Sequence, residues 1–384
     1  MVSRVSPTDG GVVVLAGGGS GGHLVPGVGL ARAIQARGDD SLRVIFYSTG
    51  RPLEGRLISR VRCQHREVPA HPVPGRLVDL PRWIWRQAAS LARAWGQVSQ
   101  DRPRVVVGLG GFGAAAPVLA AWMRGIPTVL LEQNVIPGRA NRLLAPLASE
   151  IHLQWEETRD HFQWHPGLCA TGSPLGQELQ GRANGQRVEL LEGFGLQPDR
   201  HLLLATGGSQ GARSLNRHMA GAMQELGPAM RGRLQILHLA GAATPVEELR
   251  ACYAELGIPH RVVEFLEEMP LAYAIADLVI CRAGGTTLAE LAAAGLPALM
   301  LPYPYATNRH QHANAEAFSR RGAGVVLDEG GLTPARLARE VEGILLNPVR
   351  RQEMARAALT LARPMAGFTI AQRIERLALG ESAR

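Results

Sequence analysis

The chain has 384 residues, of which 46% are hydrophobic and 19% charged, so it has enough apolar side chains to form folded domains and is not a disordered chain. Its length predicts two domains. The 41 basic and 33 acidic residues give a net charge of +8, and every basic residue is arginine. The lack of lysine excludes Schiff-base chemistry and a P-loop lysine, whereas the positive charge favours an anionic partner: a phosphate, a nucleic acid or a membrane surface.

Four cysteines are scattered along the chain without a C-x-x-C spacing, which is typical of free thiols and predicts a cytoplasmic protein. The N-terminus has no basic segment followed by a long apolar run, so we expect no signal peptide. Residues 105–123 carry no charge and are long enough to span a membrane. Because four glycines and Pro117 interrupt this stretch, we predict a buried strand, a glycine loop and a helix instead.

Three segments repeat one order, in which a short apolar strand leads into a glycine loop and then a helical pattern. The expected strands lie at 12–15, 105–107 and 202–204, and the loops at 17–22, 110–113 and 207–211. This order is the unit from which parallel α/β sheets are built. We therefore predict an α/β protein with two doubly wound parallel-sheet domains.

A glycine loop that opens a helix is a binding site for a phosphate group. The first loop also satisfies G-x-G-x-x-G, the dinucleotide fingerprint. That site requires an acidic residue at the end of the second strand, which we expect at 44–47. Here Ser48-Thr49-Gly50 follows this strand, and Asp39 and Asp40 precede it. The sequence therefore predicts a phosphate site of another kind.

Residues 278–297 predict an apolar strand, a polar glycine turn and a helix that begins with threonine and carries Glu290 in its first turn. A carboxylate at this place can hold the two hydroxyls of a ribose while the turn binds phosphates. Thr287-x-x-Glu290 also has the spacing of a capping box. Spacing alone leaves both roles open.

Five segments in order resemble the MurG family of N-acetylglucosaminyltransferases: GGGSGGH, GLGGFGAAAP, LLEQNVIPGRANRLLA, TGGSQGARSLN and CRAGGTTLAELAAAGLPALMLPYPYATNRHQHANA. The resemblance implies the GT-B fold, with two Rossmann-like domains facing across a cleft. It implies a lipid-acceptor and membrane-associating domain at 1–170, a UDP-sugar donor domain at 177–363, and a C-terminal helix at 364–384 that returns to the first domain.

The activity implied by the resemblance is transfer of N-acetylglucosamine from UDP-N-acetylglucosamine to the 4-hydroxyl of the N-acetylmuramoyl sugar of lipid I. The products are lipid II and UDP, and direct displacement inverts the anomeric centre to a β-1,4 linkage. No metal or cofactor is expected, because helix N-termini and glycine loops can hold the charge of the leaving group. The implied location is peripheral, on the cytoplasmic face of the inner membrane, in peptidoglycan synthesis.

The resemblance also implies roles for individual residues. The acceptor pyrophosphate is expected at Gly18, Gly19, Gly110, Gly111, Phe112 and Gly113. The donor is expected at Ser20, Gly21, Gly22, Asn134, Ser209, Gln210, Leu266, Gly285, Thr286, Thr287, Glu290 and Gln311. Gly176 stands where the family has a donor-contacting arginine, so one diphosphate contact is lost unless Arg213 or Arg282 replaces it.

His23 is the candidate general base. It is expected at the start of a helix, where the helix dipole disfavours imidazolium and leaves a neutral ring that can accept the proton of the acceptor hydroxyl. The alternative is a turn or phosphate contact. His310 and His312 are the close histidine pair near the site, and without carboxylate partners in the sequence we expect surface histidines and no metal site.

A helix expected after Pro81 predicts a membrane contact. Ile84, Ala88, Leu91 and Trp95 recur at helical spacing and should face the core. Leu77, Leu80, Trp83 and Trp85 should then face outward among arginines, which suits an anionic membrane surface. The alternative is an ordinary packed helix with solvated arginines.

Other functions fit the same domain organisation. A related glycosyltransferase could act on a diacylglycerol or a polyketide, and a nucleotide-sugar 2-epimerase shares the two-domain architecture, but the EQN and GGSQGAR segments favour the MurG family. A non-catalytic UDP-sugar or lipid-binding protein would have no need of His23, Asn134, Glu290 and Gln311 together. Nucleic acid is not expected as a partner, because the arginines are dispersed and no aromatic platform accompanies them.

Overall fold

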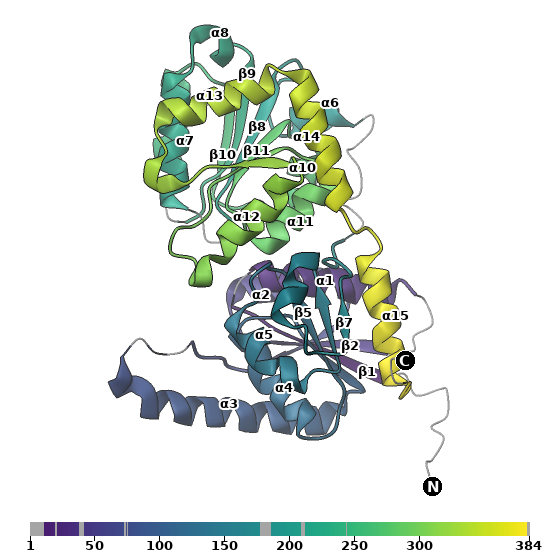
Figure 1. Cartoon of the computed structure of the whole chain (residues 1–384). Helices are drawn as coiled ribbons and strands as arrows, with labels where there is room; N and C mark the ends of the chain where they lie inside the picture. The colour runs from purple at the N-terminus through teal and green to yellow at the C-terminus, as the bar shows by residue number, and fades with distance from the viewer. Residues whose placement is uncertain are drawn as a thin grey trace. The chain divides into compact units, whose positions relative to one another are not determined.

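The computed structural model describes residues 11–19, 21–37, 42–72, 74, 76–176, 186–208, 212–242 and 244–381. The chain forms two compact units (Figure 1), one made of residues 1–176 and 363–384 (unit 1) and the other of residues 177–362 (unit 2). Each unit contains a parallel sheet with helices on both faces. The predicted α/β class, with two Rossmann-like domains, is confirmed.

In the described part of unit 1, seven parallel strands form one sheet in the order β3-β2-β1-β4-β5-β6-β7. The strands are β1 (Gly11–Ala16), β2 (Leu42–Ser48), β3 (Gln64–Glu67), β4 (Val105–Gly108), β5 (Thr128–Glu132), β6 (Glu150–Leu153) and β7 (Leu168–Cys169). The central strands are rich in β-branched residues and buried on both faces, as parallel sheets require.

Two groups of helices cover the two faces of this sheet. Alternate side chains of β1 divide between them: Val13 and Leu15 pack with α1, α2 and α15, whereas Val12 and Val14 pack with α3, α4 and α5. The helices are α1 (Gly21–Gln35), α2 (Pro52–Ile58), α3 (Leu80–Asp101), α4 (Ala115–Trp122), α5 (Arg139–Leu144) and α15 (Ala366–Ala378), with 3₁₀ turns at η1 (Leu77–Asp79), η2 (Phe112–Ala114), η3 (Ala145–Leu147) and η4 (Glu156–His161).

Unit 2 repeats this plan, and its described strands follow the order β10-β9-β8-β11-β12-β13, all parallel. The strands are β8 (His201–Thr206), β9 (Leu234–Leu239), β10 (His260–Val263), β11 (Leu278–Cys281), β12 (Ala298–Met300) and β13 (Gly324–Val326). The helices are α6 (Arg187–Gly193), α7 (Arg213–Glu225), α8 (Pro228–Arg231), α9 (Val246–Glu255), α10 (Met269–Ile275), α11 (Gly285–Ala294), α12 (His310–Arg320), α13 (Pro334–Leu345) and α14 (Pro348–Leu361), with 3₁₀ turns η6 (Thr307–Arg309) and η7 (Glu329–Gly331).

The strand order places a ligand site in each unit. Consecutive connections leave in opposite directions from β1 and β4 in unit 1, and from β8 and β11 in unit 2. The two loops that follow the strands of each pair therefore run in opposite directions. Ligands of open α/β sheets bind at such switch points. The predicted glycine loops at 17–22, 110–113, 207–211 and 284–285 are the loops that follow these four strands.

The predicted inner face of α3 was wrong except at Leu91, which packs against the core. Ile84 and Trp95 are 55% and 39% exposed, whereas Ser90, Ala94 and Val98 are buried against α4 and the sheet. The reason is that small residues allow the long helix to lie close to α4, so the apolar stripe read from the sequence is rotated outward.

Residues 105–123 form β4, η2 and α4, as predicted, and not one long helix. Within the described residues, no helix is both long and apolar enough to span a membrane.

The C-terminal helix α15 belongs to unit 1 and lies along α1 (Figure 1). Gly367 allows a close approach, because a Cβ there would come within 3.1 Å of Ala33 Cβ. Farther along the helix, Arg373 donates two hydrogen bonds of 2.8 Å to the Glu150 carboxylate, which is buried on β6 beside His152. Burial alone would raise the pKa of Glu150, but the hydrogen bonds from His152 and Arg373 outweigh it and lower this pKa to about 2.

We predict that Arg373→Met destabilises unit 1 by about 1–3 kcal/mol at pH 7, because a buried carboxylate loses its partly exposed partner. All six tryptophans lie between Trp83 and Trp164, so tryptophan fluorescence during urea unfolding reports on unit 1 alone. The exposed Arg376 gives the matched control, Arg376→Met.

The same pair predicts a pH dependence. The folded pKa of Glu150 lies below its ordinary value of 4.5, so this stabilisation is present above that pH and is lost as pH falls towards 2. The difference between wild type and Arg373→Met should therefore shrink between pH 6 and pH 3. A difference that stays constant over this range would contradict the assignment.

Candidate functional site

The two glycine loops of unit 1 touch each other at the switch point. Leu109 N–H donates to Ala16 O at 2.8 Å, and a Cβ on Gly113 would lie 3.0 Å from Gly18 N. Gly110 and Gly111 have φ of +97° and +70°, which favour glycine. The predicted acceptor residues Gly18, Gly19 and 110–113 are thus brought together, with Phe112 42% exposed at the end of the second loop.

His23 lies in the first turn of α1, two residues after Gly21, and its ring rests on the second glycine loop. A Cβ on Gly110 would come within 2.9 Å of His23 Nδ1, and one on Gly111 within 3.0 Å of His23 Cδ2. Both glycines are therefore needed so that the imidazole can lie at the helix N-terminus beside the loop. Gly21 and Gly22, predicted donor residues, form the same turn.

Sequence reasoning missed Glu54, which holds the first glycine loop in place. Its carboxylate is 2% exposed and accepts hydrogen bonds from Gly19 N (2.7 Å), Thr49 N (2.8 Å) and Thr49 Oγ1 (2.7 Å). Burial opposes its ionisation, but the donors at Gly19, Thr49, Arg51 and Ser48 outweigh burial and lower the pKa of Glu54. The Gly19 amide therefore donates to a side chain, and a contact between Gly19 and the acceptor pyrophosphate stays a prediction.

The Glu132-Gln133-Asn134 segment at the end of β5 reaches the same place. Gln133 Nε2 donates to Leu109 O at 3.2 Å, which joins this segment to the second glycine loop. The buried Glu132 Oε1 accepts from Asn134 N (2.9 Å) and Asn134 Nδ2 (3.1 Å), and Glu132 Oε2 accepts from Gly138 N (3.0 Å) and Asn141 Nδ2 (2.9 Å). The predicted donor residue Asn134 is thus oriented by a second buried carboxylate.

In unit 2 the predicted nucleotide turn leads from β11 into α11. Gly284 is the N-cap, so Gly285, Thr286 and Thr287 form the first turn and Glu290 lies in the second. Thr287 does not cap the helix, and the capping-box alternative for Glu290 is wrong. The helix begins earlier than threonine propensity suggested, because glycine at the N-cap also permits the chain to turn.

Glu290 instead accepts a hydrogen bond of 2.9 Å from the hydroxyl of Tyr273, a buried residue on α10. Burial raises the pKa of Glu290 to about 7, against the lowering effect of the Tyr273 hydroxyl. Glu290 is half-buried in the second turn of α11, so it is not a structural cap of this helix, and its role toward the ribose stays a prediction.

Asn314 and Arg282, which lie in the last of the five segments quoted from the sequence, also fix this turn. Asn314 Nδ2, fully buried on α12, donates to Ala283 O at 3.0 Å. Arg282 donates to Leu301 O (2.7 Å) and Ser214 Oγ (2.6 Å) and pairs with Glu329 at 2.9 Å. Because its guanidinium is engaged within unit 2, Arg282 is a poor replacement for the arginine missing at position 176. Arg213 is exposed at the first position of α7 and stays the candidate.

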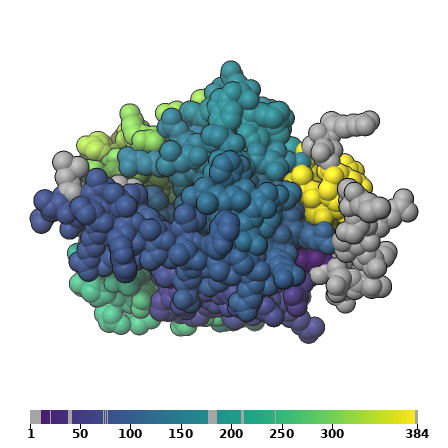
Figure 2. Space-filling view, turned by 90° about the horizontal axis from the view of Figure 1, so that it is seen from below, coloured from purple at the N-terminus to yellow at the C-terminus, as the bar shows by residue number. Residues whose placement is uncertain are grey.

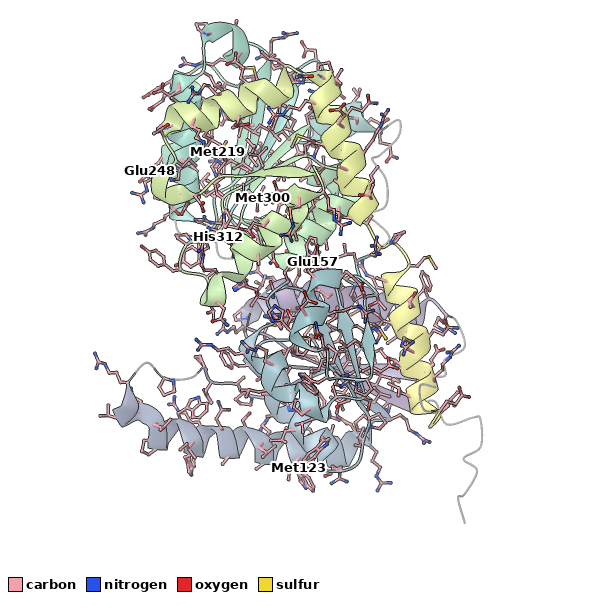
Figure 3. The ribbon with its side chains drawn as sticks, in the orientation of Figure 1. Met123, Glu157, Met219, Glu248, Met300 and His312 are labelled. Atoms are coloured by element: carbon pink, nitrogen blue, oxygen red, sulfur yellow. The ribbon has the colours of Figure 1, made fainter. Side chains whose placement is uncertain are left out.

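The remaining predicted residues of unit 2 lie on separate elements. Leu266 is half-buried in the loop between β10 and α10, and Gln311 on α12 accepts from Tyr303 N at 2.9 Å. His312, labelled in Figure 3, was wrongly expected to be a surface histidine, since it is 12% exposed and bonds Asp328 at 2.5 Å. In the described parts of the chain, no group of three or more His, Cys, Asp or Glu side chains could hold a metal ion.

Some predicted residues lie outside the described residues. These are Ser20, Ser209 and Gln210, together with Asp39 and Asp40 and the side chain of Leu77.

Comparison with known proteins gives two family matches. Residues 13–153 match the glycosyltransferase family 28 N-terminal domain, and residues 202–369 match its C-terminal domain. A protein of Geobacter sulfurreducens named UDP-N-acetylglucosamine–N-acetylmuramyl-(pentapeptide) pyrophosphoryl-undecaprenol N-acetylglucosamine transferase is 36% identical over 356 residues, covering 91% of this chain and 94% of the relative. A Syntrophotalea carbinolica protein of the same name is 37% identical over 361 residues, with the same two coverages.

Solved structures agree with this match. The crystal structure of Acinetobacter baumannii MurG has a TM-score of 0.71 and 27% identity, covering 95% of this chain and 99% of that one. UDP-GlcNAc 2-epimerase from Neisseria meningitidis, with a TM-score of 0.67, covers 95% of this chain and 99% of its own. At 12% identity it shares the fold alone. The chain belongs to the MurG family of glycosyltransferase family 28.

Proposed function

We propose that the chain transfers N-acetylglucosamine from UDP-N-acetylglucosamine to the 4-hydroxyl of the N-acetylmuramoyl sugar of lipid I, giving lipid II and UDP in peptidoglycan synthesis. The observation that carries the proposal is the match over nine-tenths of both chains to relatives named for this transfer. The glycine loops at both switch points support it, because one substrate is a nucleoside diphosphate sugar and the other a lipid pyrophosphate.

Unit 1 takes the acceptor and unit 2 the donor. His23 accepts the proton of the attacking hydroxyl while the new bond forms at the anomeric carbon and the bond to the diphosphate breaks, so the configuration inverts from α to β. In unit 2, the first turn of α11 faces the diphosphate and stabilises the charge that develops on UDP. Glu290 accepts from the ribose hydroxyls and Gln311 contacts the sugar. This arrangement needs no metal ion.

The direct test measures UDP release from UDP-N-acetylglucosamine in EDTA, with and without a lipid I analogue. We expect release that depends on the acceptor. Donor binding without release would instead indicate a non-catalytic relative, and release with a different lipid acceptor would indicate a related glycosyltransferase.

His23→Ala should lower kcat by about 10²–10⁴-fold, the usual effect of a lost general base, and leave the Kd for UDP unchanged. His161 is an exposed histidine of the same unit, so His161→Ala is the matched control. Unchanged turnover in His23→Ala would remove this residue from the base role and favour the turn-contact alternative.

Donor binding should weaken in acid. With the pKa of Glu290 at about 7 in the free protein, the carboxylate that accepts from the ribose is lost below this pH, and the Kd for UDP should rise by about tenfold per pH unit. Tyr273→Phe removes a hydrogen bond that lowers this pKa, so the midpoint should move to higher pH. In Glu290→Gln the pH dependence should vanish; a Kd for UDP that follows the same pH curve in this variant would exclude the ribose role.

We also infer that α3 contacts an anionic membrane surface. Leu80, Ile84 and Trp85 are exposed by 38%, 55% and 72%, with Arg82 and Arg86 on the same helix. Trp83 is less exposed than predicted, because its Nε1 donates to His71 O at 3.2 Å. Figure 2 shows side chains of α3, in blue, spread over one face of the chain. Trp122 at the end of α4 and Met123 after it are also exposed, and Met123 is labelled near α3 in Figure 3.

Trp85→Ser should weaken binding to phosphatidylglycerol vesicles by about tenfold, because one large aromatic side chain no longer enters the interface. Trp164→Ser is the matched control, since Trp164 is 59% exposed and lies away from α3 in the sequence. Co-sedimentation with vesicles measures the difference. Equal binding by both variants would favour the ordinary packed helix with solvated arginines.

A further inference from the structure

Glu54 and Arg51 bind the two peptide groups that flank Gly19 in the first glycine loop. Glu54 Oε1 accepts from Gly19 N at 2.7 Å, and Arg51 Nη1 donates to Gly19 O at 2.6 Å. Gly19 has a φ of +92°, a backbone conformation that favours glycine at this position. Arg51 is the N-cap of α2 and Glu54 lies in the first turn of this helix, and neither belongs to a recognised glycine motif.

Gly18 of the first glycine loop lies directly against the Glu54 carboxylate. A Cβ on Gly18 would lie 2.7 Å from Glu54 Oε1 and 3.0 Å from Thr49 Cγ2, so glycine is required at this position as well. Glu54 Oε2 also accepts from Thr49 N and from Arg51 N (3.2 Å), and these hydrogen bonds fix the turn between β2 and α2. The loop held in this way leads directly into the first turn of α1, where His23 lies.

We propose that Glu54 is a positioning residue for the transfer reaction, and that it acts by fixing the Gly19 peptide and, through it, the start of α1 and the His23 ring. This inference rests on the proposed function and adds to it a residue outside the glycine motifs. A shift of about 1 Å in a catalytic group costs up to about 10²-fold in rate. A loop that is held less firmly should therefore lower turnover without weakening the binding of the donor substrate.

The test compares Glu54→Gln with Glu150→Gln, because Glu150 is an equally buried carboxylate of unit 1 that lies on β6 and bonds Arg373 and His152. Gln at position 54 has one acceptor oxygen and presents an NH₂ group to backbone donors. We expect Glu54→Gln to lower kcat by at least about tenfold with the KM for UDP-N-acetylglucosamine changed by less than about twofold. Glu150→Gln should lower unit 1 stability, read from tryptophan fluorescence, and leave kcat unchanged.

A second readout does not depend on activity. Amide hydrogen exchange of the peptide spanning residues 16–24 should be faster in Glu54→Gln than in wild type and unchanged in Glu150→Gln.

If the wild-type chain releases no UDP with lipid I, the proposed function fails and the exchange readout alone decides the role of Glu54. Should Glu54→Gln fail to fold, Thr49→Val removes one of the donors to Glu54 and should shift both readouts in the same direction by less. A kcat equal to that of Glu150→Gln, or unchanged exchange, would overturn the proposal.

Discussion

The site of unit 1 depends on buried carboxylates that accept hydrogen bonds from backbone amides. Glycine loops leave many N–H groups without a partner from regular structure, and such groups destabilise a buried loop unless something accepts from them. Glu54 does this for the first loop and Glu132 for the segment after β5. Each carboxylate takes donors on both oxygens, so Gly19 and residues 134–138 are held by contacts within unit 1.

Unit 2 reaches a similar result by different means. Its predicted nucleotide turn is held by Arg282 within the turn and by Asn314 from α12, while its carboxylate, Glu290, accepts from one tyrosine hydroxyl. Burial raises the pKa of Glu290 because one tyrosine hydroxyl does not offset it, whereas several donors offset burial at Glu54 and lower the pKa of that carboxylate. Glu54 thus holds a loop, whereas the binding of a substrate by Glu290 stays a prediction.

The fold class and the glycine loops could be predicted because they depend on local patterns: β-branched runs, glycine clusters and helix starts. The motifs alone do not determine the strand order, and it is the strand order that places these loops at the switch points. The roles of Glu54, Tyr273 and Asn314 could not be predicted, since each acts across a distance in sequence that no spacing rule describes. The inner face of α3 was wrong for a related reason: Ser90 and Ala94 face the core because α4 lies close, and hydrophobicity alone favoured Ile84 and Trp95.

The central claim is that the loops of unit 1 are ordered before substrate binds. Residue-resolved amide hydrogen exchange of the wild-type chain, with and without the lipid I analogue, tests it most directly. The account predicts that the amides of Gly19, Asn134 and Gly138 exchange slowly in the free protein and gain little protection from the ligand. Fast exchange in the free protein that becomes slow only when the ligand binds would contradict it.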